Sequence, residues 1–98
     1  MGTYILMTKL SPDITSDIKH REKIGRKWMN KVNESCPEVK WVSHYALLGP
    51  YDFMDIFEAP NEEVAAKVSM ITLASGAIQA ESWTAIPYNR FLELADEI

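Results

Sequence analysis

One stretch, LGPYDFMDIFEAP at residues 48–60, constrains the fold more than any other part of the chain. It begins with Gly49, Pro50 and Asp52, which are residue types that favour a tight turn. The FMDIFE run that follows is rich in β-forming apolar side chains and predicts a strand. A proline then breaks the strand, and Asn61 directly after it is a good N-cap for a helix. The middle of the chain is therefore expected to run from a hairpin turn through a strand into a helix.

The rest of the sequence alternates between strand-like and helix-like periodicities. Runs rich in β-branched and aromatic residues predict strands at 3–10, 38–48, 53–58 and 77–86. Apolar residues at helical spacing predict a short turn at 12–18, a main helix at about 20–34, a second helix from 62 to about 74, and a short acidic helix at 88–98. Gly76 is expected to end the second of the two longer helices.

The resulting order, β-α-β-β-α-β with a C-terminal helix, predicts a single α+β domain spanning residues 1–98. Right-handed crossovers give the ferredoxin-like fold, a four-stranded antiparallel sheet of order 4-1-3-2 with both helices on one face. The other face would expose large apolar side chains, which monomers rarely do. Two sheets packed face to face would solve this and enclose a barrel-like space. His44 or Asp55 would then line the space between the subunits of a homodimer.

Composition excludes several classes of protein. A net charge of −4 argues against a nucleic-acid binder. Neither a membrane-spanning stretch nor a signal peptide is evident. The single Cys36 suits a reducing compartment, so we expect a cytoplasmic protein. Positive charge nevertheless gathers on the first helix, which is either a solvated face or a docking site for an anionic ligand or partner. The cluster comprises Lys19, Arg21, Lys23, Arg26, Lys27 and Lys31.

Asp55 is the residue that fold alone does not readily explain. It lies between Phe53 and Phe57, and a carboxylate among aromatic rings must be paired, hydrated or shifted in pKa. One interpretation is a structural pairing with Lys9 or Lys40. The other is a catalytic acid or base in a pocket, with His44 as its neighbour. Simple alternation places His44 on the face opposite to Trp41 and Tyr45, and the register needed to join it to Asp55 stays open.

A ligand site, if present, would draw on the aromatic residues of the strands and turn. Trp41 and Trp83 either pack in an interface or core, or form an aromatic wall. Tyr51 either anchors the hairpin or reaches into the pocket. With His44 and Asp55 above, the candidate ligand-binding set is completed by Tyr4, Trp41, Tyr51 and Trp83. The spacing of His, Cys and acidic residues matches no metal-binding motif, and no cofactor is expected.

The run at residues 45–61, YALLGPYDFMDIFEAPN, resembles the signature of the GYD-domain family. The opening run from Tyr4 to Pro12 is similar to that family's first strand and turn. Membership implies a small bacterial or archaeal protein of the dimeric α/β-barrel group, without a generally established activity. The turn is also similar to one in the ligand-binding domains of Lrp/AsnC-type regulators, where it lies near an effector pocket between subunits. The chain departs from the family at residues 34–37, where Glu-Ser-Cys-Pro replaces the usual Gly-Gly pair.

Three functions remain open at this point. The first is a homo-oligomeric sensor or accessory module that binds a small organic ligand between its subunits. The second is an enzyme, a cofactor-independent oxygenase or isomerase of the dimeric α/β-barrel group, with His44 or Asp55 as the base. The third is a purely structural oligomer without a pocket. The sequence does not decide whether the chain is an enzyme.

Overall fold

A computed structural model describes residues 1–15 and 18–98 of the chain. Its four strands form one antiparallel sheet. The sheet order is β2-β3-β1-β4, so the expected order of 4-1-3-2 and the ferredoxin-like α+β fold are confirmed. The strands are β1 (Gly2–Leu10), β2 (Lys40–Ala46), β3 (Phe53–Ala59) and β4 (Ala77–Ala85).

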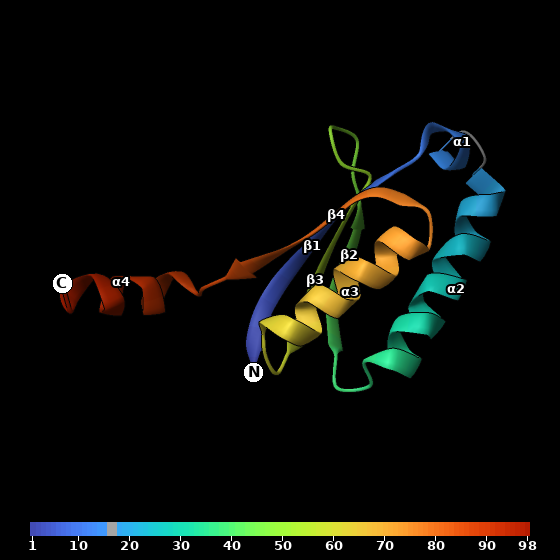
Figure 1. Cartoon of the computed structure of the whole chain (residues 1–98). Helices are drawn as coiled ribbons and strands as arrows, with labels where there is room; N and C mark the ends of the chain where they lie inside the picture. The colour runs from blue at the N-terminus through green and yellow to red at the C-terminus, as the bar shows by residue number, and fades with distance from the viewer. Residues whose placement is uncertain (16–17) are drawn as a thin grey trace.

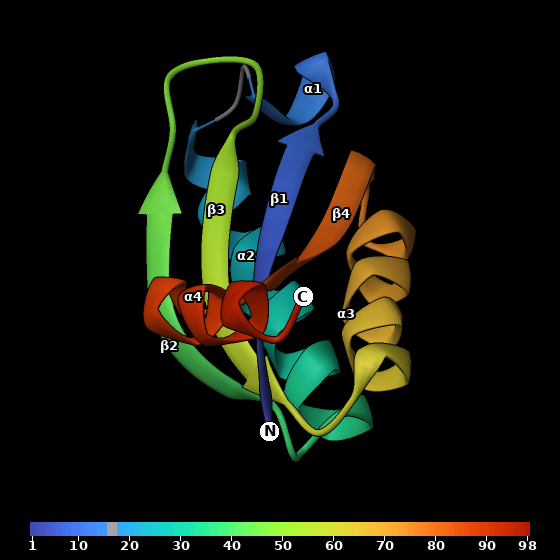
Figure 2. The same ribbon diagram turned by 90° about the vertical axis from the view of Figure 1, so that its left-hand side faces the viewer.

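Two of the four described helices cover one face of this sheet, as Figure 1 shows. The helices are α1 (Pro12–Thr15), α2 (Ile18–Ser35), α3 (Glu62–Ala74) and α4 (Tyr88–Asp96). The helices that cover the sheet are α2 and α3, while Figure 2 looks onto the opposite, open face. The expected helical turn at 12–18 is present as far as Thr15, and residues 16–17 lie outside the described part of the chain.

Helix α3 begins and ends where its sequence predicts. The Asn61 side chain accepts a hydrogen bond of 3.1 Å from the Val64 N–H, which satisfies one of the free donors of the first turn. Glu62 and Glu63 in that turn place negative charge at the positive end of the helix dipole. At the other end Gly76 has a φ of 111°, a left-handed conformation that glycine adopts without steric cost.

The hydrophobic core lies between the sheet and these two helices. Leu6 and Phe57 from the sheet are fully buried, as are Val32 of α2 and Val68 of α3. Tyr4 stacks against Phe57 with ring centroids 5.6 Å apart, which extends the core along β1. The sheet and both helices thus contribute buried side chains to one core.

A β-bulge in β2 changes which side chains face this core. Trp41 pairs with Phe57 and His44 pairs with Asp55, but between them Ser43 alone pairs with Ile56, which leaves Val42 as an extra residue. Two residues thus oppose one, and alternation is offset by one position. Trp41 and His44 consequently lie on the same, helix-covered face. The expectation that His44 faces away from Trp41 is wrong, because simple alternation does not allow for a bulge.

The open face and α4 leave apolar surface without a partner inside the chain. The register places six large side chains on the open face, namely Ile5, Met7, Tyr45, Met54, Ile56 and Trp83. Helix α4 stands out from the sheet on this side, as Figures 1 and 2 show, and none of its residues is buried. Within the described residues, no helix combines the length and apolar character that crossing a membrane requires.

Candidate functional site

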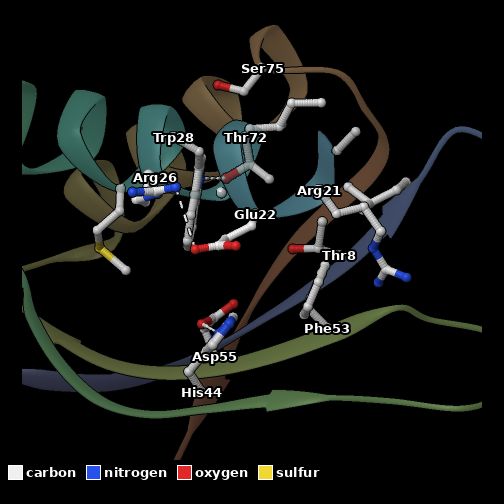
Figure 3. A pocket seen from close by; sticks show the side chains of 15 residues that line it. Thr8, Arg21, Glu22, Arg26, Trp28, His44, Phe53, Asp55, Thr72 and Ser75 are labelled. Atoms are coloured by element: carbon white, nitrogen blue, oxygen red, sulfur yellow. Dashed lines mark hydrogen bonds and ion pairs between the residues drawn. The ribbon is translucent and has the colours of Figure 1, made fainter. Parts of the chain in front are cut away.

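A cavity of about 420 Å³ lies between α2 and the helix-covered face of the sheet. Figure 3 shows its side chains converging from α2 on one side and from the strands on the other, with Thr72 of α3 and its C-cap residue Ser75 also in the lining. Most of the lining is apolar. The main apolar contributors are Leu10, Ile24, Trp28, Met29, Phe53 and Ala77. Binding sites for small organic molecules have this size and character.

The cavity exists because α2 is anchored to the core near its C-terminal end. Val32 is the only buried residue in the described part of this helix. One turn earlier, the Trp28 indole N–H donates a hydrogen bond of 2.8 Å to Thr72 Oγ1 on α3, and its ring centroid lies 5.3 Å from that of Trp41. Further towards the N-terminus, a Cβ on Gly25 would meet nothing within 4 Å. The helix therefore leaves open space beside residues 21–29.

His44 and Asp55 lie together on the sheet side of this cavity (Figure 3). The bulge brings the two residues opposite each other, and His44 Nδ1 pairs with Asp55 Oδ1. The Asp55 side chain is 2% exposed, whereas that of His44 is 56% exposed. The His44 ring also stacks on Phe53, with centroids 5.3 Å apart. A buried carboxylate thus orients a histidine whose ring remains accessible from the cavity.

Burial dominates the electrostatics of Asp55. Loss of hydration raises the pKa of its carboxyl group above the ordinary value, and the charge and hydrogen bond of His44 offset part of this rise. The partner differs from the expected lysines. Lys9 Nζ donates a hydrogen bond of 3.0 Å to the Pro50 carbonyl, and Lys40 pairs with Glu58 in the sheet register, three pairs away from Asp55. The expectation of a Lys9 or Lys40 partner is wrong, because the bulge supplies His44 instead.

Three charged residues of α2 line the cavity as well. The Arg21 guanidinium lies 5.1 Å from the centroid of the Phe53 ring, a cation–π contact. Arg26 forms an ion pair of 3.4 Å with Glu22, one helical turn earlier. Among the described residues, Arg21 has no carboxylate partner. The cavity therefore combines apolar walls with two paired carboxylates and one arginine whose hydrogen-bond donors are available.

The six residues expected to bind a ligand do not gather at one site. His44 and Asp55 line the cavity, whereas Tyr4 and Trp41 belong to the core beside it. Tyr51 and Trp83 lie elsewhere. The sheet register puts Trp83 opposite Ile5 on the open face, and the Tyr51 ring meets Trp83 edge-on at 6.2 Å.

The structure also decides the role of Tyr51 and the location of His44 and Asp55. The Tyr51 hydroxyl donates a hydrogen bond of 2.9 Å to Glu81 Oε2 on β4, so Tyr51 anchors the hairpin rather than reaching into the cavity. The same hydrogen bond raises the pKa of the Tyr51 hydroxyl. The expectation that His44 and Asp55 line a space between two open sheet faces is also wrong, because both residues lie under the helices.

Several cavity residues were not among the sequence candidates. Arg21 belongs to the basic cluster of the first helix, and its position directly over Phe53 becomes evident only in three dimensions. Trp28 and Thr72 come from different helices, and their hydrogen bond joins residues 44 positions apart. Apolar residues next to a basic cluster were the available signal, but that pattern also describes any amphipathic surface helix.

Other reactive groups of the chain lie outside the cavity. Cys36 is fully buried, and its burial raises the pKa of the thiol, which favours the unreactive protonated form. No group of three or more His, Cys, Asp or Glu side chains in the described part of the chain is arranged to hold a metal ion.

Comparison with known proteins shows which family the chain belongs to. The family model described as the GYD domain matches residues 4–95. The chain belongs to the GYD-domain family. A similar protein from Thermus thermophilus is named glutamine synthetase and cystathionine beta-lyase binding protein. It is 32% identical to this GYD domain over 88 residues, which cover 89% of this chain and 90% of the relative.

A solved structure shares the fold of this GYD domain. The crystal structure of FFRP-DM1 aligns with a TM-score of 0.55, covering 88% of this chain and 100% of that chain. The sequence identity is 22%, so the likeness concerns the fold alone.

Proposed function

We propose that this GYD domain is a cytoplasmic, homo-oligomeric accessory protein that binds a small organic ligand in the cavity beneath α2. The observation that carries this proposal is the cavity itself, about 420 Å³ of mostly apolar space with a few oriented polar groups. Natural ligand sites have volumes of roughly 300–1,000 Å³ and this same mixture of walls. A purely structural oligomer has no need for such a space, because close packing is the more stable arrangement for a core.

A role as an accessory protein is supported by a similar protein and by two surfaces of this chain that have no partner within it. The T. thermophilus relative is named as a binding protein for two enzymes, which favours a protein partner for this chain too. The open sheet face and α4 offer the apolar surface that contact with another protein needs. We infer that the open face packs against a second copy of the chain, which leaves the ligand cavity of each protomer on the outside of the dimer.

Ligand binding is tested with a thermal-shift screen of small organic compounds, followed by calorimetric titration of the hits. The Ala77→Phe variant places a large ring at the wall of the cavity and should abolish binding. Its matched control is Ile78→Phe, because Ile78 is the next residue of β4, is 51% exposed and does not line the cavity. Equal binding to both variants would show that the ligand lies elsewhere.

Self-association is tested by size-exclusion chromatography with light scattering at micromolar concentration. Trp83→Glu places a charge on the open face and should shift a dimer towards monomer. Thr84→Glu is the control on the same strand, since Thr84 pairs with Tyr4 and so points to the opposite face of the sheet. A monomeric wild-type protein at this concentration would remove the basis for a homo-oligomer.

A second candidate function, proton transfer on a bound substrate, is favoured by the His44–Asp55 pair. A buried carboxylate that orients an accessible imidazole is the arrangement from which a histidine acts as a general base. Under this candidate His44→Ala abolishes turnover, and Asp55→Asn lowers it by roughly 10²-fold or more. Under the binding function alone, both variants retain ligand affinity within a few fold and no ligand is converted.

A further inference from the structure

We propose that the cavity beneath α2 selects an organic carboxylate, with its apolar body between α2 and the sheet and its carboxylate on Arg21. This inference rests on the proposed function, since it assigns a chemical class to the ligand of that same cavity. Three independent features support it: the apolar walls, the pairing of the charged groups, and the sign of the charge on α2.

The apolar walls determine the body of the ligand. Trp28 of α2 lies across the cavity from Phe53 of β3 (Figure 3), and Met29 of α2 also lines the cavity, so an aromatic ring or short alkyl chain would bury its surface against apolar walls. The nearby polar groups of α3 are already satisfied. Thr72 Oγ1 accepts from Trp28 and donates to the Val68 carbonyl at 2.7 Å, and Ser75 Oγ donates to the Ile71 carbonyl at 2.8 Å. The α3 side of the cavity therefore favours hydrocarbon over a polar group.

The charged groups determine the sign of the ligand. Both carboxylates that line the cavity have a basic side chain as partner, since Asp55 pairs with His44 and Glu22 pairs with Arg26. Arg21 is different, because its guanidinium lies over the Phe53 ring, and a cation–π contact uses none of its N–H donors. A guanidinium with free in-plane donors matches the two oxygens of a carboxylate. Among the described cavity residues, Arg21 is therefore the charged group that a ligand can complete.

The surrounding helix adds a field of the same sign. Between residues 19 and 27, α2 carries five Lys and Arg side chains against the single carboxylate of Glu22. The chain as a whole has a net charge of −4, so this positive region stands out against an acidic protein. A positive region around a low-dielectric cavity concentrates anions and speeds their capture. The sequence alone allowed two interpretations of the basic cluster, a solvated helix face or an anion-binding site. Its position beside the cavity favours the anion-binding site.

The test compares ligands of one shape and three charges. Calorimetric titration of the full chain with 3-phenylpropionate, its neutral amide 3-phenylpropanamide and the cation 3-phenylpropylamine should rank the carboxylate first. We expect it to bind about tenfold tighter than the amide, the value of one charge-assisted pair in a partly exposed site. Arg21→Gln should reduce this preference to about threefold or less, and Arg21→Lys should retain part of it. Lys23→Gln removes the same charge from the same helix at a residue that does not line the cavity, and should leave the preference intact.

Each alternative result has a distinct meaning. If the amide binds as tightly as the carboxylate, or the amine binds more tightly, the charge assignment is overturned and the ligand-binding function stands. If carboxylate binding survives Ala77→Phe, the anion binds the basic surface of α2 and the cavity assignment is overturned. If none of the three compounds binds at millimolar concentration, and the same holds for a panel of C6–C10 aliphatic carboxylates, the carboxylate assignment is overturned, and the broad thermal-shift screen decides the ligand-binding function separately.

Discussion

Asp52 Oδ2 accepts a hydrogen bond of 2.8 Å from the backbone N–H of Leu10, a residue 42 positions earlier in the chain. The Asp52 N–H in turn donates to the Thr8 carbonyl at 2.8 Å. These two bonds fasten the loop between β2 and β3 to the end of β1. The aspartate of the turn that the sequence singled out thus connects three strands, and the connection carries no catalytic group.

Replacing this aspartate should destabilise the fold. We expect Asp52→Ala to lower the free energy of unfolding by about 1–2 kcal/mol, because the Leu10 N–H loses a charged acceptor in a partly buried position. Asp52→Asn keeps an oxygen acceptor and should recover about half of the loss. Urea unfolding followed by tryptophan fluorescence measures both variants. An Asn variant no more stable than the Ala variant would contradict the hydrogen-bond explanation.

Two glycines should respond in opposite directions to alanine. Gly25→Ala should raise the free energy of unfolding by roughly 0.5–1 kcal/mol, because Gly25 lies inside α2 and its Cβ would meet nothing within 4 Å. Gly76→Ala should lower it by about 1–2 kcal/mol, since Gly76 has a left-handed φ and its Cβ would lie 2.9 Å from Ile14 Cδ1. Thermal unfolding of the two variants beside the wild type provides the comparison.

The raised pKa of Asp55 predicts a specific pH dependence of stability. Between the ordinary carboxyl pKa of about 3.9 and the higher folded value, the folded state holds more protons on this group than the unfolded state. Its stabilising contribution is therefore complete below the unfolded pKa and is lost as the pH rises through the folded pKa.

Asp55→Asn isolates this contribution from those of the other acidic groups. The free energy of unfolding of the wild type, minus that of the variant, should decrease as the pH is raised from about 3 through the folded pKa. Denaturant unfolding at a series of pH values gives both curves. A difference that increases with pH would mean that pairing with His44 outweighs the desolvation of Asp55.

The order of the strands followed from the sequence, whereas the faces of β2 did not. In β1 and β3, strict alternation correctly separates Leu6 and Phe57 from Ile5 and Ile56. In β2, Val42 adds a residue that no turn signal marks, because it is an ordinary strand former. A single extra residue was enough to reverse the assignment of His44. Bulges depend on pairing across strands, and a single strand read alone does not show them.

The sequence also did not predict on which face of the sheet the cavity lies. Alternation places apolar side chains on both faces of β1, which is compatible with a pocket under the helices or between subunits. The choice depends on how closely α2 approaches the sheet. That distance is set by Trp28, Thr72 and Trp41, which come from three separate elements.

Deleting the bulge residue should be tolerated. In a chain without Val42, Trp41 still pairs with Phe57, Ser43 with Ile56 and His44 with Asp55, so each side chain keeps its face. We expect a loss of about 1–2 kcal/mol or less for this deletion. Deletion of Met54 is the control, because β3 has no extra residue there and the deletion turns one end of the strand over. Circular dichroism and unfolding of the two deletion variants would show whether the bulge is dispensable.

The strand order also has a consequence for synthesis of the chain. Strand β1 lies between β3 and β4, yet it leaves the ribosome before either of them. The β2–β3 hairpin can pair locally as soon as Ala59 is made, but β1 gains its second neighbour only when Ala85 has been added. A nascent chain therefore holds a central strand of its sheet with an unpaired edge for most of its translation, a condition that favours rapid synthesis of the C-terminal half or protection by a chaperone.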